Sequence, residues 1–133
     1  MTTDADGPRA ADVLVLFGIT GDLARKLVLP ALYQLVAGSE LTVPVIGVAL
    51  TDLDTDGLRR HVAECVQAAG ATDPAVLEKM LGLVHLVSGD YADPDVFTRL
   101  ATAVAGEAGP DAFAVNYLAV PPSLFGTVAD GIA

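Results

Sequence analysis

The sequence predicts an α/β protein of Rossmann type, with a doubly wound, mostly parallel sheet and flanking helices. Three observations carry this expectation. Apolar, strand-like runs alternate with helical patterns along the chain, as in parallel sheets with helical crossovers. The first run, Val13–Phe17, is apolar at every position, which is typical of a strand buried on both faces. This run leads directly into the glycine turn Gly18–Asp22, and a helical pattern follows the turn.

The helical pattern after this turn begins at Leu23 and extends to about Ala37. Pro30 lies inside it and is expected to kink the helix or to remove one hydrogen bond, because proline has no backbone N–H. Gly38 is the expected C-cap. The remaining expected elements are, in order, a strand at Val43–Ala49, a helix from Asp54 or Thr55 to Ala69, a helix from Pro74 to about Leu81, a strand at Leu83–Ser88, a helix opened by Pro94, a strand at Ala112–Ala119 and a helix opened by Pro121 and Pro122.

The expected sheet is incomplete. It has about four strands, whereas a complete dinucleotide-binding fold has about six. Residues 13–133 are therefore interpreted as a partial dinucleotide-binding domain, with the C-terminal substrate domain absent from this chain. Met1–Asp12 is polar and acidic and is expected to be a disordered lead. Missing strands should leave an apolar edge and face exposed, which favours self-association.

Composition argues against several functional classes. The 133 residues are 53% hydrophobic, and 17 acidic against 7 basic residues give a formal net charge of −10. A nucleic-acid-binding protein would carry a basic stripe, and an anionic membrane would repel this charge, so neither partner is expected. Cys65 is the single cysteine and is interpreted as a small buried helix residue. With no signal peptide and no apolar run of about 20 residues, the chain is expected to be soluble and cytoplasmic.

The glycine turn is the strongest candidate for a binding site. A helix N-terminus offers unpaired N–H groups and a partial positive charge, which together stabilise a phosphate. Gly18 allows a sharp exit from the strand, and Gly21 allows a phosphate oxygen to approach the backbone. The alternative is a tight turn without a ligand, in which Asp22 only caps the helix and Arg25 and Lys26 form a solvated face.

Four ordered segments resemble glucose-6-phosphate dehydrogenases. That family opens its coenzyme domain with Gly-x-Ser/Thr-Gly-Asp-Leu-Ala, followed by basic residues and a proline, and Leu14–Leu32 resembles this opening. The likeness continues at Val45–Ala49, at Gly89–Asp93 and at Tyr117–Pro122. The resemblance implies a Rossmann-like coenzyme domain that uses NADP.

The resemblance also implies a role for particular residues. The coenzyme pyrophosphate would lie on the turn, the segment after the second strand would decide between coenzymes, the end of the third strand would flank the adenine, and the end of the fourth would line the nicotinamide approach. The corresponding residues are Gly18, Ile19, Thr20, Gly21, Asp22 and Leu23 for the turn, Leu50 and Thr51 after the second strand, Asp90 and Tyr91 after the third, and Ala119, Val120 and Pro121 after the fourth.

Coenzyme choice is one departure from the family pattern. Leu50 stands where the family usually has an arginine that pairs with the 2′-phosphate of NADP, and Asp52 would repel that phosphate. Thr51 remains able to donate a hydroxyl, and Arg25, Arg59 or Arg60 could reach in from nearby helices. We therefore expect NADP as coenzyme with a weakened preference, so that NAD is accepted as well.

The second departure concerns catalysis. The family's later motifs for catalysis and sugar-phosphate binding do not occur in this sequence. His85 is interpreted as a satisfied core residue and His61 as a solvated helix residue, neither with an orienting partner. The resemblance implies a full-length parent that oxidises glucose 6-phosphate to 6-phosphogluconolactone in the pentose phosphate pathway, whereas this chain alone should be inactive. The alternatives are a stand-alone, non-catalytic dinucleotide-binding module, and a truncated scaffold whose turn binds nothing tightly.

Overall fold

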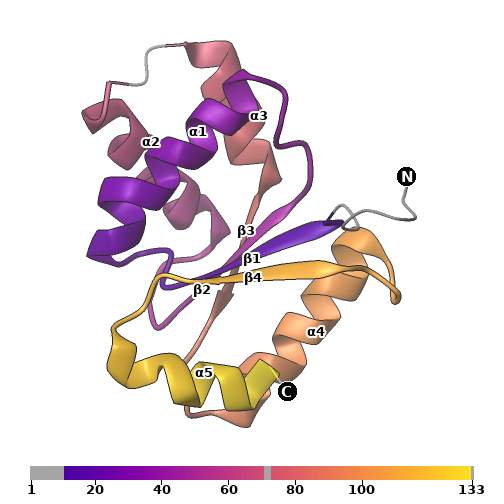
Figure 1. The fold of residues 1–133 in the computed structure, drawn as a ribbon. Coiled ribbons are helices and arrows are strands. Elements are labelled where there is room, and N and C mark those ends of the chain that lie inside the picture. Colours follow the sequence, from indigo (N-terminus) through magenta and orange to yellow (C-terminus); the bar gives the residue numbers. More distant parts are fainter. Residues whose placement is uncertain (1–10, 71–72, 133) are drawn as a thin grey trace.

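A computed structural model describes residues 11–70 and 73–132. It contains one four-stranded parallel sheet in the order β3-β2-β1-β4, with helices on both faces (Figure 1). The strands are β1 (Val13–Phe17), β2 (Val45–Ala49), β3 (Val84–Ser88) and β4 (Ala114–Leu118). The helical elements are η1 (Ala24–Val28), α1 (Leu29–Ala37), α2 (Thr55–Ala68), α3 (Pro74–Leu83), α4 (Pro94–Ala108), η2 (Pro122–Leu124) and α5 (Phe125–Ile132).

The sheet confirms the expected α/β architecture. β1 pairs in parallel with β2 on one side and with β4 on the other, so Val15 lies between Ile46 and Asn116. β3 pairs in parallel with the outer side of β2. Along the chain, β2 and then β3 are added on one side of β1, and β4 is added on its other side. In open α/β sheets, ligands bind beside the carboxyl ends of the strands at such a change of direction, here between β1 and β4.

Two apolar layers hold the helices on the sheet. One layer packs α1, α2 and α3 against one face and includes Leu16 and Leu58. The other packs α4 and α5 against the opposite face and includes Phe17 and Val96 (Figure 1). Successive residues of β1 supply opposite layers, because side chains alternate between the faces of a strand. This explains why Val13–Phe17 is apolar throughout.

The first helix differs from its expected form. Helical backbone begins at Asp22, and residues 24–28 form a π-helix that continues into α1. The N–H of Leu29 donates to the carbonyl of Ala24, five residues earlier. Pro30 follows this wider turn directly, and a proline ring would crowd the carbonyl four residues before it in a regular α-helix. The chain therefore widens before Pro30. α1 then ends at the expected Gly38.

Element boundaries shift by a few residues for identifiable reasons. β2 begins at Val45, later than Val43, since only the carbonyl of Pro44 takes part in the ladder, accepting from Leu14 N–H at 3.0 Å. β4 begins at Ala114, after a turn in which Ala112 N–H donates to Gly109. The expected caps Asp54, Asp73 and Asp93 each accept a backbone hydrogen bond at their helix starts.

Of the expected lead Met1–Asp12, all but the last two residues lie outside the described residues. Within residues 11–70 and 73–132, no helix combines the length and the apolar character needed to cross a membrane.

Candidate functional site

Gly18 joins the ends of three strands. Its N–H donates to the carbonyl of Val48 in β2 at 2.8 Å. Its φ is +83°, a conformation that favours glycine, and a Cβ at this position would overlap the carbonyl oxygen of Ala119, just after β4. The sharp exit from β1 therefore requires glycine for two independent reasons, both within the protein itself.

The turn after Gly18 presents backbone donors. Gly21 N–H donates to the Gly18 carbonyl at 2.9 Å, which closes the turn. Among the described residues, the N–H groups of Thr20, Asp22 and Leu23 have no backbone or side-chain acceptor. The first N–H groups of a helix lack intrahelical partners and carry a partial positive charge. These residues therefore fit the diphosphate of a dinucleotide.

Asp22 pairs with a cation on its own helix. Its Oδ1 lies 2.9 Å from Nη2 of Arg25. The hydrogen bond from Arg25, together with the charges of Arg25 and Lys26, lowers the pKa of Asp22 below its usual value. The carboxylate therefore binds Arg25 instead of capping the helix, which argues against the simple capping interpretation. It also occupies Arg25, one of the cations closest to the turn.

The segment after β2 is tied to β3 and exposes an apolar side chain. The hydroxyl of Ser88 donates to the carbonyl of Thr51 at 2.6 Å, and the Thr51 hydroxyl accepts from the N–H of Leu53 at 3.2 Å. Leu50 is 72% exposed. Thr51 is thus engaged locally at both its carbonyl and its hydroxyl oxygen, while Leu50 faces solvent with no charge to offer.

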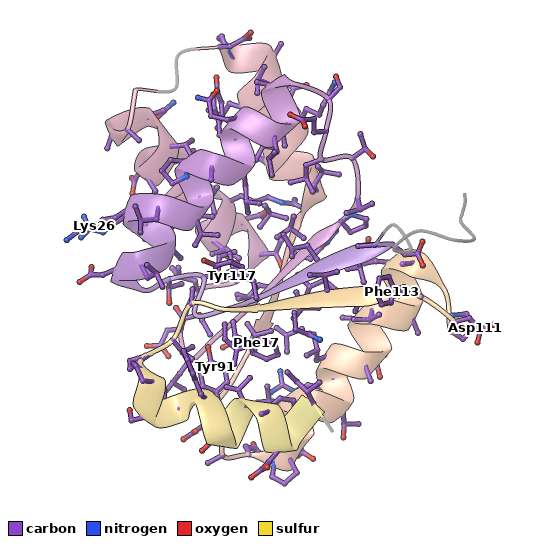
Figure 2. The ribbon with its side chains drawn as sticks, viewed as in Figure 1. Phe17, Lys26, Tyr91, Asp111, Phe113 and Tyr117 are labelled. Atoms are coloured by element: carbon purple, nitrogen blue, oxygen red, sulfur yellow. The ribbon has the colours of Figure 1, made fainter. Side chains whose placement is uncertain are left out.

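Tyr91 lies farther inward than its position after β3 suggests. Its hydroxyl donates to the carbonyl of Val48 at 3.0 Å, and its ring meets Phe17 edge-on with a centroid distance of 6.0 Å. Figure 2 shows both rings on the α5 side of the sheet. Burial raises the pKa of Tyr91, and the nearby Gly18 N–H partly offsets this effect. Tyr91 therefore braces the ends of β1 and β2, a contact that no sequence pattern indicated.

The other residues expected after β3 and β4 differ in exposure. Asp90 is exposed, and its Oδ1 accepts from Ala92 N–H at 2.9 Å. Ala119 and Val120 are buried, and Ala119 N–H donates to the carbonyl of Phe17 at 2.9 Å. Pro121 is exposed. The structure thus brings together the turn after β1 and the end of β4, while Leu50 and Asp90 follow the neighbouring strands along the same edge.

Both histidines have partners, contrary to expectation. His85 was expected in the core, but its side chain is 30% exposed and its Nε2 lies 3.2 Å from Oε1 of Glu107. It lies in β3, which has a neighbouring strand on one side only, so its ring reaches the protein surface. His61 Nε2 lies 3.6 Å from Sγ of Cys65, and both line a cavity of about 420 Å³ beside η1.

Cys65 is buried, as expected, and burial raises its pKa, which keeps the thiol protonated. No group of three or more His, Cys, Asp or Glu residues within the described part of the chain could hold a metal ion.

Comparisons with known proteins agree with this architecture. Residues 15–133 match the family model described as "Glucose-6-phosphate dehydrogenase, NAD binding domain". Glucose-6-phosphate 1-dehydrogenase 1 of Mycobacterium tuberculosis H37Rv is 35% identical over 127 residues, which cover 96% of this chain and 26% of that protein. The corresponding enzyme of Treponema pallidum is 33% identical over 135 residues, again covering 96% of this chain and 26% of the relative.

Two solved structures have the same fold. Glucose-6-phosphate 1-dehydrogenase from Mycobacterium avium superposes with a TM-score of 0.84 at 38% identity, covering 92% of this chain and 26% of that chain. A glucose-6-phosphate dehydrogenase in complex with glucose 6-phosphate superposes with a TM-score of 0.82 at 29% identity, covering 95% and 28%. The chain spans about a quarter of these relatives. By its sequence and its fold, the chain belongs to the glucose-6-phosphate dehydrogenase family, within which it matches the NAD binding domain.

Proposed function

We propose that this chain is the coenzyme-binding part of a glucose-6-phosphate 1-dehydrogenase and that it holds a nicotinamide dinucleotide across the carboxyl edge of its sheet. The observation that carries the proposal is the turn after β1, where Gly18 packs against Ala119 and the N–H groups of Thr20, Asp22 and Leu23 have no acceptor among the described residues. This is the arrangement that binds diphosphates at helix N-termini.

In the proposed arrangement the diphosphate lies on residues 18–23. The adenosine lies toward Leu50, Thr51, Asp90 and Tyr91, and the nicotinamide toward Ala119, Val120 and Pro121. The dinucleotide, when bound, supplies the hydride acceptor. The residues of this chain bind and orient it, and the buried side chains of Ala119 and Val120 anchor the segment after β4 on which its nicotinamide end would lie.

We propose that the site accepts both NADP, the coenzyme of the family type, and NAD. Leu50 carries no charge with which to pair a 2′-phosphate, and it is largely exposed after β2. A charge-assisted hydrogen bond typically contributes about 1.5–3 kcal/mol, so its absence removes much of the usual reason for NADP to bind more tightly.

The parent enzyme is proposed to oxidise glucose 6-phosphate to 6-phosphogluconolactone in the pentose phosphate pathway, whereas the 133 residues alone do not. The reaction needs a group that accepts the sugar hydroxyl proton. His61 contacts Cys65 and His85 pairs with Glu107, so the nearest partner of neither histidine belongs to the turn. A stand-alone, non-catalytic dinucleotide-binding module is the alternative. Reduction of NADP or NAD by the purified chain in the presence of glucose 6-phosphate would contradict the proposal that these 133 residues alone are inactive.

A calorimetric titration of the purified chain with NADP and with NAD tests the binding. Gly21→Val is the informative variant, because a Cβ there would lie 3.3 Å from the Gly18 carbonyl oxygen and the side chain would crowd the phosphate position without requiring a positive φ. We expect it to weaken binding at least about tenfold, or about 1.4 kcal/mol. Gly106→Val in α4, where a Cβ meets nothing within 4 Å, is the matched control. A folded sample that binds neither dinucleotide would contradict the proposal.

We also propose that the chain self-associates through β4 and is cytoplasmic. Val115 and Tyr117 in β4 are 42% and 47% exposed, and Tyr117 lines an apolar cavity of about 270 Å³ with Leu27 and Leu35. Exposed apolar strand edges favour pairing with another chain. Sedimentation velocity should show association that Val115→Lys reduces.

The free Cys65 suits a reducing compartment, and the net charge of −10 disfavours nucleic acid and anionic membranes as partners.

A further inference from the structure

The segment between β2 and α2 is strongly acidic. In dinucleotide-binding folds, the adenosine ribose lies near the end of the second strand, and an acidic residue there favours a free 2′-hydroxyl. Residues 50–58 include Asp52, Asp54 and Asp56 but no lysine or arginine. Leu50, the first of them, is 72% exposed and uncharged. The charge in this region is therefore negative where the 2′ position of a bound coenzyme would lie.

Local hydrogen bonds distinguish the three carboxylates. Asp54 Oδ1 accepts from Gly57 N–H at 2.7 Å as the cap of α2, and Asp56 lies 4.0 Å from Arg59. Asp52 is exposed and, within the described residues, has no hydrogen bond or ion pair. The bonds from Ser88 to Thr51 and from Leu53 to Thr51 fix the backbone on both sides of it. Asp52 therefore carries an unneutralised negative charge at a fixed place.

The cations on neighbouring elements are held elsewhere. Arg25 pairs with Asp22 at 2.9 Å. Nε of Arg59 donates to the carbonyl of Val84 at 3.1 Å, and Val84 is the first residue of β3, at the amino edge of the sheet and opposite the proposed site. Lys26 points outward from its helix (Figure 2).

Two further arginines lie on the helices α2 and α4. Arg60 follows Arg59 on the exposed side of α2. Arg99, from α4, lies against Gly89 at the end of β3, where its Nη2 would be 2.8 Å from a Cβ on that glycine. Gly89 N–H donates to the carbonyl of Ala49 at 2.9 Å, so, of these cations, Arg99 lies near the end of β2. Residues 50–58 themselves contain no lysine or arginine, so this segment supplies no cation to a 2′-phosphate.

We infer that this segment selects NAD over NADP and that Leu50 and Asp52 are the specificity-determining residues. A 2′-phosphate would find no cationic partner at Leu50 and would be repelled by Asp52, whereas the 2′-hydroxyl of NAD carries no charge. This inference rests on the proposed dinucleotide-binding function and reverses the preference expected from the family.

Calorimetric titrations of the purified chain with NAD and NADP at low salt test it. We expect NAD to bind about threefold more tightly, since loss of the arginine contact removes the usual advantage of NADP and repulsion by Asp52 then weakens NADP binding. Leu50→Arg should tighten NADP binding about tenfold and leave NAD within about threefold. Asp52→Asn should tighten NADP binding about threefold, and added salt should narrow the gap between the coenzymes because it screens repulsion.

Matched controls separate local from general charge effects. Gln34→Arg adds the same charge on α1, and Glu78→Gln removes one charge on α3, both at exposed positions away from β2. Neither should change the ratio of the two affinities. Tighter binding of NADP than of NAD by the unmodified chain would overturn the inference while supporting the proposed function. Failure of a folded sample to bind either coenzyme would overturn both.

Discussion

β2 and β4 flank β1 as similar strands in different surroundings. Each has five residues, pairs in parallel with β1 and is mostly apolar. Every residue of β2 is buried, whereas the three central residues of β4 are exposed. β2 has a neighbouring strand on either side, but in the described sheet β4 has only β1. An apolar run therefore predicts a strand without predicting how deeply the strand is buried.

The candidate site lies where these two kinds of strand meet. Gly18 donates to Val48 at the end of β2 and packs against the carbonyl of Ala119 at the end of β4. The buried side supplies a rigid base for the turn. Substitutions at this junction should therefore lower the free energy of unfolding more than substitutions along either strand.

Gly18→Ala should have the largest effect on stability. It places a Cβ on a residue with φ +83°, against the Ala119 carbonyl, so backbone strain and overlap act together. We expect the free energy of unfolding to fall by about 3 kcal/mol or more. Urea denaturation followed by circular dichroism measures it. Gly106→Ala, in the open surroundings of α4, should instead stabilise by up to about 1 kcal/mol. Equal effects of the two substitutions would show that the junction is not strained.

Val48→Thr and Val115→Thr compare the two strands directly. The substitution replaces one methyl group by a hydroxyl of similar size, so its main effect at a buried position is the cost of burying a polar group. Val48 is fully buried and should lose about 2 kcal/mol, whereas Val115 is 42% exposed and should change by less than about 0.5 kcal/mol. The same denaturation experiment applies. The comparison is made at concentrations where the chain is monomeric, and a loss at Val115 as large as that at Val48 would mean that β4 is covered even in the monomer.

The sequence predicted the local features of the fold and site more fully than the long-range ones. Alternating apolar runs and Asp-Pro caps located all four strands and their helices within a few residues. The turn at Gly18 was identifiable because its glycines follow a strand directly. The bracing of this turn by Tyr91 was not predictable, since it joins residues 43 positions apart. The partner of His85 was missed for the same reason, because Glu107 lies on a helix later in the chain.

Tyr91→Phe should have an intermediate effect, because it removes the bond to Val48 but keeps the ring against Phe17. We expect a loss of about 1 kcal/mol at pH 8. Burial raises the pKa of Tyr91 above its usual value, so the unfolded chain ionises first and this contribution to stability is lost as pH rises through the native pKa. The difference between wild type and variant should therefore shrink above about pH 10.

Tyr117→Phe, at an exposed position on β4, is the matched control and should change neither the stability nor its alkaline dependence. A pH-independent difference between wild type and Tyr91→Phe would mean that the Tyr91 hydroxyl is not buried in solution.

The ion pair at the other edge of the sheet should have the smallest effect. β3 ends the sheet on the side opposite β4, but it carries His85, which pairs with Glu107 at 3.2 Å with side chains 30% and 37% exposed. Partly exposed pairs contribute about 0–1 kcal/mol, so a double-mutant cycle of His85→Gln and Glu107→Gln should give a coupling energy below about 1 kcal/mol at neutral pH. A coupling near 2 kcal/mol would mean that this edge is shielded from solvent, in contrast to β4. A small value would mean that the pair adds little to stability, so the effect of these polar groups at the edge strand would lie in opposing pairing of β3 with other chains, as polar and charged groups at strand edges do.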